Sequence, residues 1–237
     1  MEKVKAYDLP IRAFHWIFAL LFITSFSIGN FVDDESTLYG FHMISGMVMA
    51  FMVTLRIIWG YTGTTYARFS SFLLKPHDLI NYFKSIRKGE HPRELGHNPA
   101  SSYAAVGMFI FTYALVSTGL LMVNGIEKKT FKEIHEIFGM LFLVTVLVHI
   151  VGVIFHQIRN HDGIPFSMIT GKKNPVEGKT PIGSNSPLIL VLYLMLTIGF
   201  SSYLLVNYNA DQGMLHAFGK SLQLGENEHE QHHEGHN

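Results

Sequence analysis

Five stretches of this 237-residue chain are apolar enough and long enough to cross a lipid bilayer. A membrane-spanning helix needs about 20 apolar residues, and the five stretches cover residues 11–31, 38–59, 103–123, 134–158 and 187–206. A segment inside a bilayer has to satisfy its own backbone polar groups, so helices are the expected form. Only 15% of the residues are charged, which is fewer than in a typical soluble domain. The sequence therefore predicts an all-α integral membrane helix bundle.

The distribution of lysine and arginine predicts the orientation of the bundle. Basic residues gather before the first stretch, between the second and third, and after the fourth, whereas the loop at 33–35 is acidic. By the positive-inside rule, the N-terminus lies in the cytoplasm and the C-terminal tail lies outside. No small-x-small cleavage pattern of a signal peptide follows the first stretch before Asp33. We therefore expect this stretch to be retained as the first spanning helix of a multi-pass protein.

The chain divides into three predicted regions. Residues 1–172 form a core of four spanning helices, which includes an amphipathic helix at 76–88 lying on the inner membrane surface; a solvated turn is the alternative. Residues 173–208 form a linker and the fifth helix. Residues 209–237 form an external polar tail, rich in histidine and expected to be disordered, for which weak metal binding is an alternative.

Four histidines lie within or at the ends of the apolar stretches, where titratable side chains usually mark function. His135 and His149 are fourteen residues apart, which places them on nearly one helix face about 21 Å apart. By depth, His42 matches His135 near the outer side and His15 matches His149 near the inner side. The sequence thus predicts two histidine pairs, one in each leaflet.

Each pair suits a haem better than another metal centre. Two imidazoles can occupy both axial positions of a haem iron, whereas a zinc site would need four protein ligands. The chain has no cysteine, which excludes thiolate-bound clusters and covalent haem attachment. Gly46 and Gly139 lie four residues after His42 and His135, where a flat macrocycle needs small neighbours; ordinary helix packing is the alternative.

Arg56 lies fourteen residues after His42, on the same helix face near the inner side. A buried guanidinium needs an anionic partner, for which we expect a haem propionate. The alternative is that Arg56 extends to the inner headgroups. Among the other histidines, His156 is expected at headgroup level, with ligation or a quinone pocket as alternatives. We expect surface positions for His77, His91, His97 and His161.

Several motifs together resemble the prokaryotic cytochrome b561 family, and in particular the b-type cytochrome subunits of membrane-bound nickel–iron hydrogenases and related oxidoreductases. They are RAFHW around His15, HMISG at His42, LRIIWG around Arg56, GHNP at 96–99 and HEIFGMLFLVTVLVH from His135 to His149. The resemblance covers about residues 5–172. It implies two non-covalent b haems with His15, His42, His135 and His149 as axial ligands, in a bacterial cytoplasmic (inner) membrane. The fifth helix and the tail depart from the four-helix core of this family.

The resemblance also implies electron exchange with the quinone pool and with an external redox subunit, either hydrogenase-like or c-type cytochrome-like. We therefore expect an electron-transfer subunit of a respiratory-chain oxidoreductase rather than an enzyme acting alone; the sequence allows either direction of flow. One alternative is a free-standing di-haem enzyme that oxidises superoxide or quinol, with Lys128, Lys129 and Lys132 attracting an anionic substrate. Another is a histidine-based metal or proton transporter. The formal net charge is zero, so we expect no nucleic-acid partner.

Overall fold

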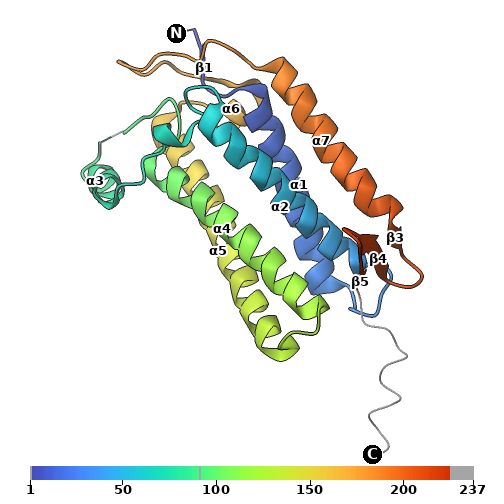
Figure 1. Ribbon diagram of the computed structural model, residues 1–237. Helices are drawn as coiled ribbons and strands as arrows, with labels where there is room; N and C mark the ends of the chain where they lie inside the picture. The colour runs from blue at the N-terminus through green and yellow to red at the C-terminus, as the bar shows by residue number, and fades with distance from the viewer. Residues whose placement is uncertain (1, 91, 225–237) are drawn as a thin grey trace, which may run out of the picture. The chain divides into compact units, whose positions relative to one another are not determined.

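The computed structural model describes residues 2–90 and 92–224, and it is mostly helical (Figure 1). The helices are α1 (Leu9–Phe31), α2 (Gly40–Thr62), α3 (Pro76–Arg87), α4 (Pro99–Val123), α5 (Lys128–Asn160), α6 (Ile164–Thr170) and α7 (Pro187–Val206), with a short 3-10 turn, η1 (Phe69–Ser71). Strands β1 (Val4–Lys5), β2 (Lys172–Lys173), β3 (Tyr208–Asn209), β4 (Met214–Ala217) and β5 (Lys220–Gln223) are short. The predicted all-α class is confirmed.

Helices α1, α2, α4, α5 and α7 are long and apolar enough to cross a membrane, as predicted. Their outward side chains are apolar as well; Leu188 and Val206 of α7 are 83% and 84% exposed. Apolar surface on this scale needs a lipid environment, so the chain is a multi-pass membrane protein. Helix α5 begins at Lys128, six residues before the predicted start at 134, because no helix-breaking residue follows Gly125. Lys128, Lys129 and Lys132 therefore belong to a helix rather than to a loop.

The chain forms two compact units. Unit 1 comprises Met1–Ile17, Val53–Phe111 and Met140–Tyr193, and unit 2 comprises Phe18–Met52, Thr112–Gly139 and Leu194–Asn237. Each of the five long helices therefore contributes residues to both units. The predicted histidine pairs separate in the same way, because His15 and His149 fall in unit 1 and His42 and His135 fall in unit 2.

In unit 1, the N-terminal segment is anchored by main-chain pairing and by a buried carboxylate. Strands β1 and β2 pair antiparallel, with Val4 opposite Lys173. Asp8 is fully buried before the first residue of α1 and accepts a hydrogen bond from the amide of Ile11 (3.1 Å), which caps the helix. Its other oxygen accepts from the indole of Trp59 (3.1 Å) and the hydroxyl of Thr64 (2.7 Å). Asp8 thus ties the start of α1 to the end of α2.

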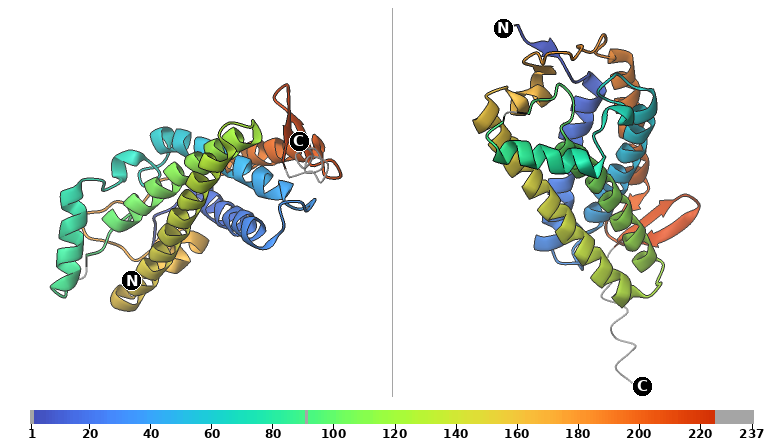
Figure 2. Two further views of the ribbon diagram at one scale, coloured as in Figure 1. Left: turned by 90° about the horizontal axis from the view of Figure 1, so that it is seen from below. Right: turned by 90° about the vertical axis from the view of Figure 1, so that its left-hand side faces the viewer.

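Helix α3 matches the amphipathic helix predicted at 76–88. It begins with Pro76 directly after Lys75, and none of its residues is buried within the chain. Ile80 and Phe83 are 53% and 56% exposed. Figure 2 shows this short helix beside the much longer spanning helices. Exposed apolar side chains on a helix with basic residues in its last turn are typical of a helix that lies on a membrane surface.

The beginning of the predicted disordered tail is ordered. Strands β3, β4 and β5 form an antiparallel sheet in unit 2, with Leu215 opposite Leu222. Phe218 and Gly219 form the two-residue turn between β4 and β5, both with positive φ, as hairpin turns of this length require. Leu215, Ala217, Leu222 and Leu224 are buried. This alternation is only a few residues long within a polar segment, which is why the expectation of disorder was wrong for 209–224. The histidines at 229–236 lie outside the described residues.

Candidate functional site

Two histidines from different helices lie close together in unit 2. His42 lies in the first turn of α2, and His135 lies two turns inside α5. The centres of their imidazole rings are 6.0 Å apart, and the ring planes are inclined by 60°. The start of α2 and the start of α5 both belong to unit 2.

In each ring, the hydrogen bond made by Nδ1 determines that Nε2 is the nitrogen with an available lone pair. The Nδ1 atom of His42 lies 2.8 Å from the carbonyl oxygen of Ser25, which can only accept, so Nδ1 carries the hydrogen. The Nδ1 atom of His135 lies 2.9 Å from the hydroxyl of Thr118. That hydroxyl donates its own hydrogen to the carbonyl oxygen of Ala114 (2.9 Å), so it accepts from His135. In both rings Nε2 is therefore left with its lone pair.

Glycines control the space around these two rings. A Cβ atom at Gly29 would lie 2.8 Å from Cε1 and Nδ1 of His42, so only glycine lets α1 come this close. A Cβ atom at Gly119 would lie 3.8 Å from Cε1 of His135. For the two predicted glycines there is more space. A Cβ atom at Gly46 would lie 3.8 Å from Val116, an ordinary contact distance, and a Cβ atom at Gly139 would have no described atom within 4 Å. The sequence analysis missed Gly29, whose role depends on a contact between helices.

The second pair, His15 and His149, lies in unit 1. His15 on α1 packs edge-to-face against Trp16, with 5.1 Å between the ring centres. It is close enough to His149 on α5 for the two rings to interact electrostatically. The Nδ1 atom of His15 is buried and has no hydrogen-bond partner among the described residues. The Nδ1 atom of His15 therefore lacks the hydrogen bond that the Nδ1 atoms of His42 and His135 make.

Arg56 is buried in unit 1, with 4% of its surface exposed. Its Nη2 atom donates to the carbonyl oxygen of Ala67 (3.0 Å), and its guanidinium lies over the rings of Phe69 and Phe72, at 5.6 and 6.0 Å. Its Nη1 atom is buried without a partner among the described residues. The alternative in which Arg56 extends to the headgroups is therefore wrong. The carboxylate of Asp8 interacts with it electrostatically.

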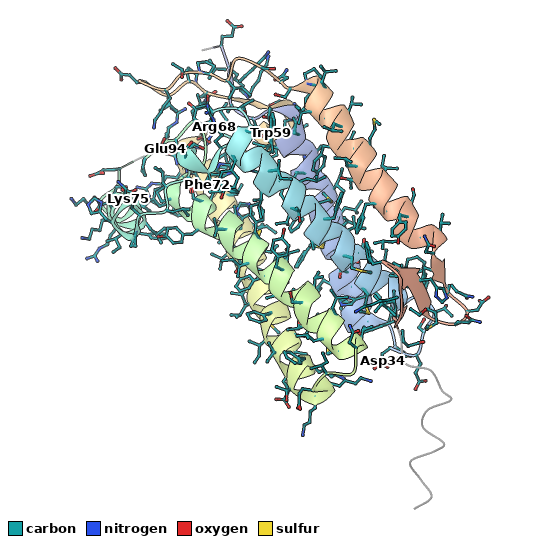
Figure 3. All side chains as sticks on the ribbon, viewed as in Figure 1. Asp34, Trp59, Arg68, Phe72, Lys75 and Glu94 are labelled. Atoms are coloured by element: carbon teal, nitrogen blue, oxygen red, sulfur yellow. The ribbon has the colours of Figure 1, made fainter. Side chains whose placement is uncertain are left out.

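His97 is not the surface residue that was expected. Its ring packs between Phe72 and Tyr7, with ring centres 4.6 and 5.7 Å away, and its Nδ1 atom is buried without a partner among the described residues. Lys173, only 2% exposed, donates to the carbonyl oxygens of Glu94 (2.6 Å) and Gly96 (3.4 Å) and so fixes the loop that carries His97. Figure 3 labels Phe72, which packs against the His97 ring, and Glu94, whose carbonyl oxygen accepts the hydrogen bond from Lys173.

The environment of His97 should make unit 1 sensitive to acid. Burial, together with the positive charges of Arg56 and Lys173, lowers the pKa of His97 to about 3. An unfolded histidine has a pKa of about 6.5, so between these values the unfolded chain binds more protons and stability falls as the pH falls. We expect the His97→Gln variant, whose side chain does not titrate, to lose less thermal stability than the parent between pH 6.5 and pH 4. The exposed His77, changed to Gln, is the control and should leave the slope unchanged.

His156, expected at headgroup level, also lies inside unit 1. Its Nε2 atom is 3.0 Å from Oδ2 of Asp162, and the two side chains are 5% and 2% exposed. Arg93 approaches the same carboxylate oxygen at 3.9 Å. Because its Nε2 is engaged by Asp162, His156 serves as an internal partner of that carboxylate. A sequence cannot reveal this pairing, which depends on the turn between α5 and α6.

Comparison with known proteins identifies relatives of the chain. The model of the family described as prokaryotic cytochrome b561 matches residues 6–171. A probable Ni/Fe-hydrogenase B-type cytochrome subunit of Rhizobium leguminosarum bv. viciae is 24% identical over 217 residues, which cover 73% of this chain and 89% of the relative. The protein of the same name from Bradyrhizobium diazoefficiens is 24% identical over 217 residues, covering 72% and 85%.

A probable Ni/Fe-hydrogenase 1 B-type cytochrome subunit of Escherichia coli K12 is 25% identical over 141 residues, covering 50% of this chain and 59% of the relative. No solved structure matches the chain significantly. The family match covers well over half of the chain and contains all four histidines of the two pairs. The chain therefore belongs to the prokaryotic cytochrome b561 family, whose members are b-type cytochromes.

Proposed function

We propose that this protein is the cytochrome b subunit of a membrane oxidoreductase, which carries electrons across the bilayer between an external redox partner and the quinone pool. It does so with two non-covalent b haems, one at each histidine pair. The observation that carries the proposal is the pair formed by His42 and His135, whose ring centres lie 6.0 Å apart and whose Nδ1 atoms are both within hydrogen-bond distance of an oxygen acceptor.

The dimensions of this pair suit a metal ion held between the two rings. Metal bonds to imidazole nitrogen are about 2 Å long, and a ring centre lies about 1 Å beyond its nitrogen, so two axial imidazoles have centres about 6 Å apart. Among the described residues, no three histidine, cysteine or acidic side chains converge as a metal site built by the protein alone would require. A centre that needs only two protein ligands is therefore favoured, and in a b-type cytochrome that centre is haem.

The residues of the chain have distinct tasks in this proposal. His42 and His135 hold one iron, and His15 and His149 hold the other. The guanidinium of Arg56, with its unpartnered Nη1 atom, donates to a propionate carboxylate in unit 1. Gly46 and Gly139 leave room beside the ligands of unit 2. When bound, the haem irons supply reversible one-electron chemistry, and the protein supplies ligands, orientation and electrostatics.

The partner is proposed from the relatives and from the charge distribution. The relatives are named as subunits of Ni/Fe hydrogenases, so we infer a hydrogenase-like subunit on the outer side of the bacterial inner membrane. The excess of basic residues puts the N-terminus, and with it unit 1, at the cytoplasmic side. Quinone would then exchange electrons near unit 1, and lipid would cover the exposed apolar faces of the long helices.

Purification from the native membrane tests this function. We expect two haems per chain, the absorbance band of a reduced b-type cytochrome, and a co-purifying hydrogenase-like subunit. A colourless protein would overturn the proposal in favour of a histidine-based transporter. A red protein that is isolated alone and reduces quinone with superoxide as the electron donor would overturn it in favour of a free-standing enzyme.

A further inference from the structure

We infer that the hydrogen bonds to His42 and His135 give the haem proposed for unit 2 the lower reduction potential of the two. This inference rests on the proposed function, because it requires a haem at each pair. It assigns Thr118 and the carbonyl group of Ser25 as positioning groups for the outer ligands.

The first step is the chemistry of an imidazole whose Nδ1–H is hydrogen-bonded. Such a hydrogen bond fixes the ring orientation and raises the basicity of the other nitrogen. A more basic ligand donates more electron density to iron and stabilises the oxidised state over the reduced state, which lowers the reduction potential. In unit 2 both ligands are supported in this way, His42 by the Ser25 carbonyl at 2.8 Å and His135 by the Thr118 hydroxyl at 2.9 Å.

The acceptors in unit 2 are themselves held in place. The hydroxyl of Thr118 shares its single hydrogen between the carbonyl oxygens of Ala114 (2.9 Å) and Leu115 (3.0 Å), one turn earlier in α4. The hydroxyl of Ser25 donates to the carbonyl oxygen of His42 (3.2 Å), so α1 and α2 are joined in both directions at this point. Because Gly29 allows this approach of α1 to the His42 ring, the acceptors are part of the helix packing.

Unit 1 differs in both ligand support and charge. The Nδ1 atom of His15 is buried without a partner among the described residues, so His15 lacks the hydrogen bond that supports each ligand of unit 2. Unit 1 also holds the buried positive charges of Arg56 and Lys173, which are 4% and 2% exposed. Positive charge in a buried site favours the reduced iron, which carries one positive charge fewer. Asp8 offsets part of the Arg56 charge, but its oxygens are already hydrogen-bonded to α2 and to the turn after it.

Redox titration of the holoprotein with a substitution at Thr118 tests the inference. Valine has nearly the shape of threonine but no acceptor, so Thr118→Val should shift the lower of the two midpoint potentials upward and leave the higher one unchanged. Thr118→Ser keeps the hydroxyl and should stay close to the parent. Thr145→Val is the matched control: Thr145 also donates to the carbonyl oxygen four residues earlier (2.8 Å), but it belongs to unit 1.

A second measurement covers the case in which Thr118→Val does not fold. The His15→Ala variant should retain only the haem of unit 2, and its single midpoint potential should match the lower component of the parent. The inference is overturned if the potential of His15→Ala matches the higher component of the parent. It is also overturned if Thr118→Val shifts the higher component, or if it shifts neither component. A parent protein without haem would defeat the proposed function itself, whereas two bound haems with the wrong order of potentials would defeat this inference alone.

Discussion

Replacing His135 with alanine should reduce the haem content of the purified protein from two per chain to one. The variant leaves His42 facing an empty position across 6.0 Å, and no other described histidine lies beside the pair to take over as a ligand. One axial imidazole alone holds a b haem poorly, because nothing attaches the macrocycle covalently in a chain without cysteine. Haem per protein, measured as the pyridine haemochrome, reports the loss directly.

Two further variants identify which haem is lost. His77→Ala changes a histidine in α3 whose side chain is 79% exposed, and it should keep both haems. His149→Ala should also leave one haem, but a different one: its remaining midpoint potential should still respond to Thr118→Val. If His135→Ala retained two haems with unaltered spectra, the pairing of α2 with α5 through a common iron would be wrong.

The spanning helices were predictable because the membrane imposes a length and a polarity on them. The predicted range of the fifth helix, 187–206, agrees with α7, and the others differ from the structure by a few residues at their ends. Both the start of α5 and the small sheet of β3, β4 and β5 were missed for a related reason. Outside the bilayer core, neither length nor hydropathy constrains the chain, and local packing decides. The pairing of β1 with β2 joins segments about 170 residues apart in the sequence, which no local pattern could have indicated.

The histidine pair of unit 2 was predictable because helix geometry converts sequence spacing into depth and face. The groups around it were not. Thr118 and Ser25 are ordinary polar residues in apolar helices, and only the packing of α1 and α4 against the histidines brings them into contact. His97 was assigned to the surface because it lies in a polar loop. The buried Lys173, whose importance no motif reveals, draws that loop into unit 1.

Replacing Arg56 with leucine should lower the higher of the two midpoint potentials and weaken retention of the haem in unit 1. The substitution removes a buried positive charge and the unpartnered Nη1 donor proposed to bind a propionate. It also removes the hydrogen bond to Ala67, so some loss of thermal stability accompanies the redox change. The two effects have to be separated before either is assigned to the propionate.

Arg56→Lys separates them. Lysine keeps the charge but lacks the planar fork, which here bonds Ala67 and lies over Phe69 and Phe72. We expect this variant to lose thermal stability while its higher midpoint potential stays near that of the parent. If Arg56→Leu and Arg56→Lys lowered that potential equally, the fixed geometry of the guanidinium would matter and not its charge. If neither changed it, Arg56 would be a purely structural residue that joins α2 to the turn at Ala67, and the propionate in unit 1 would need another donor.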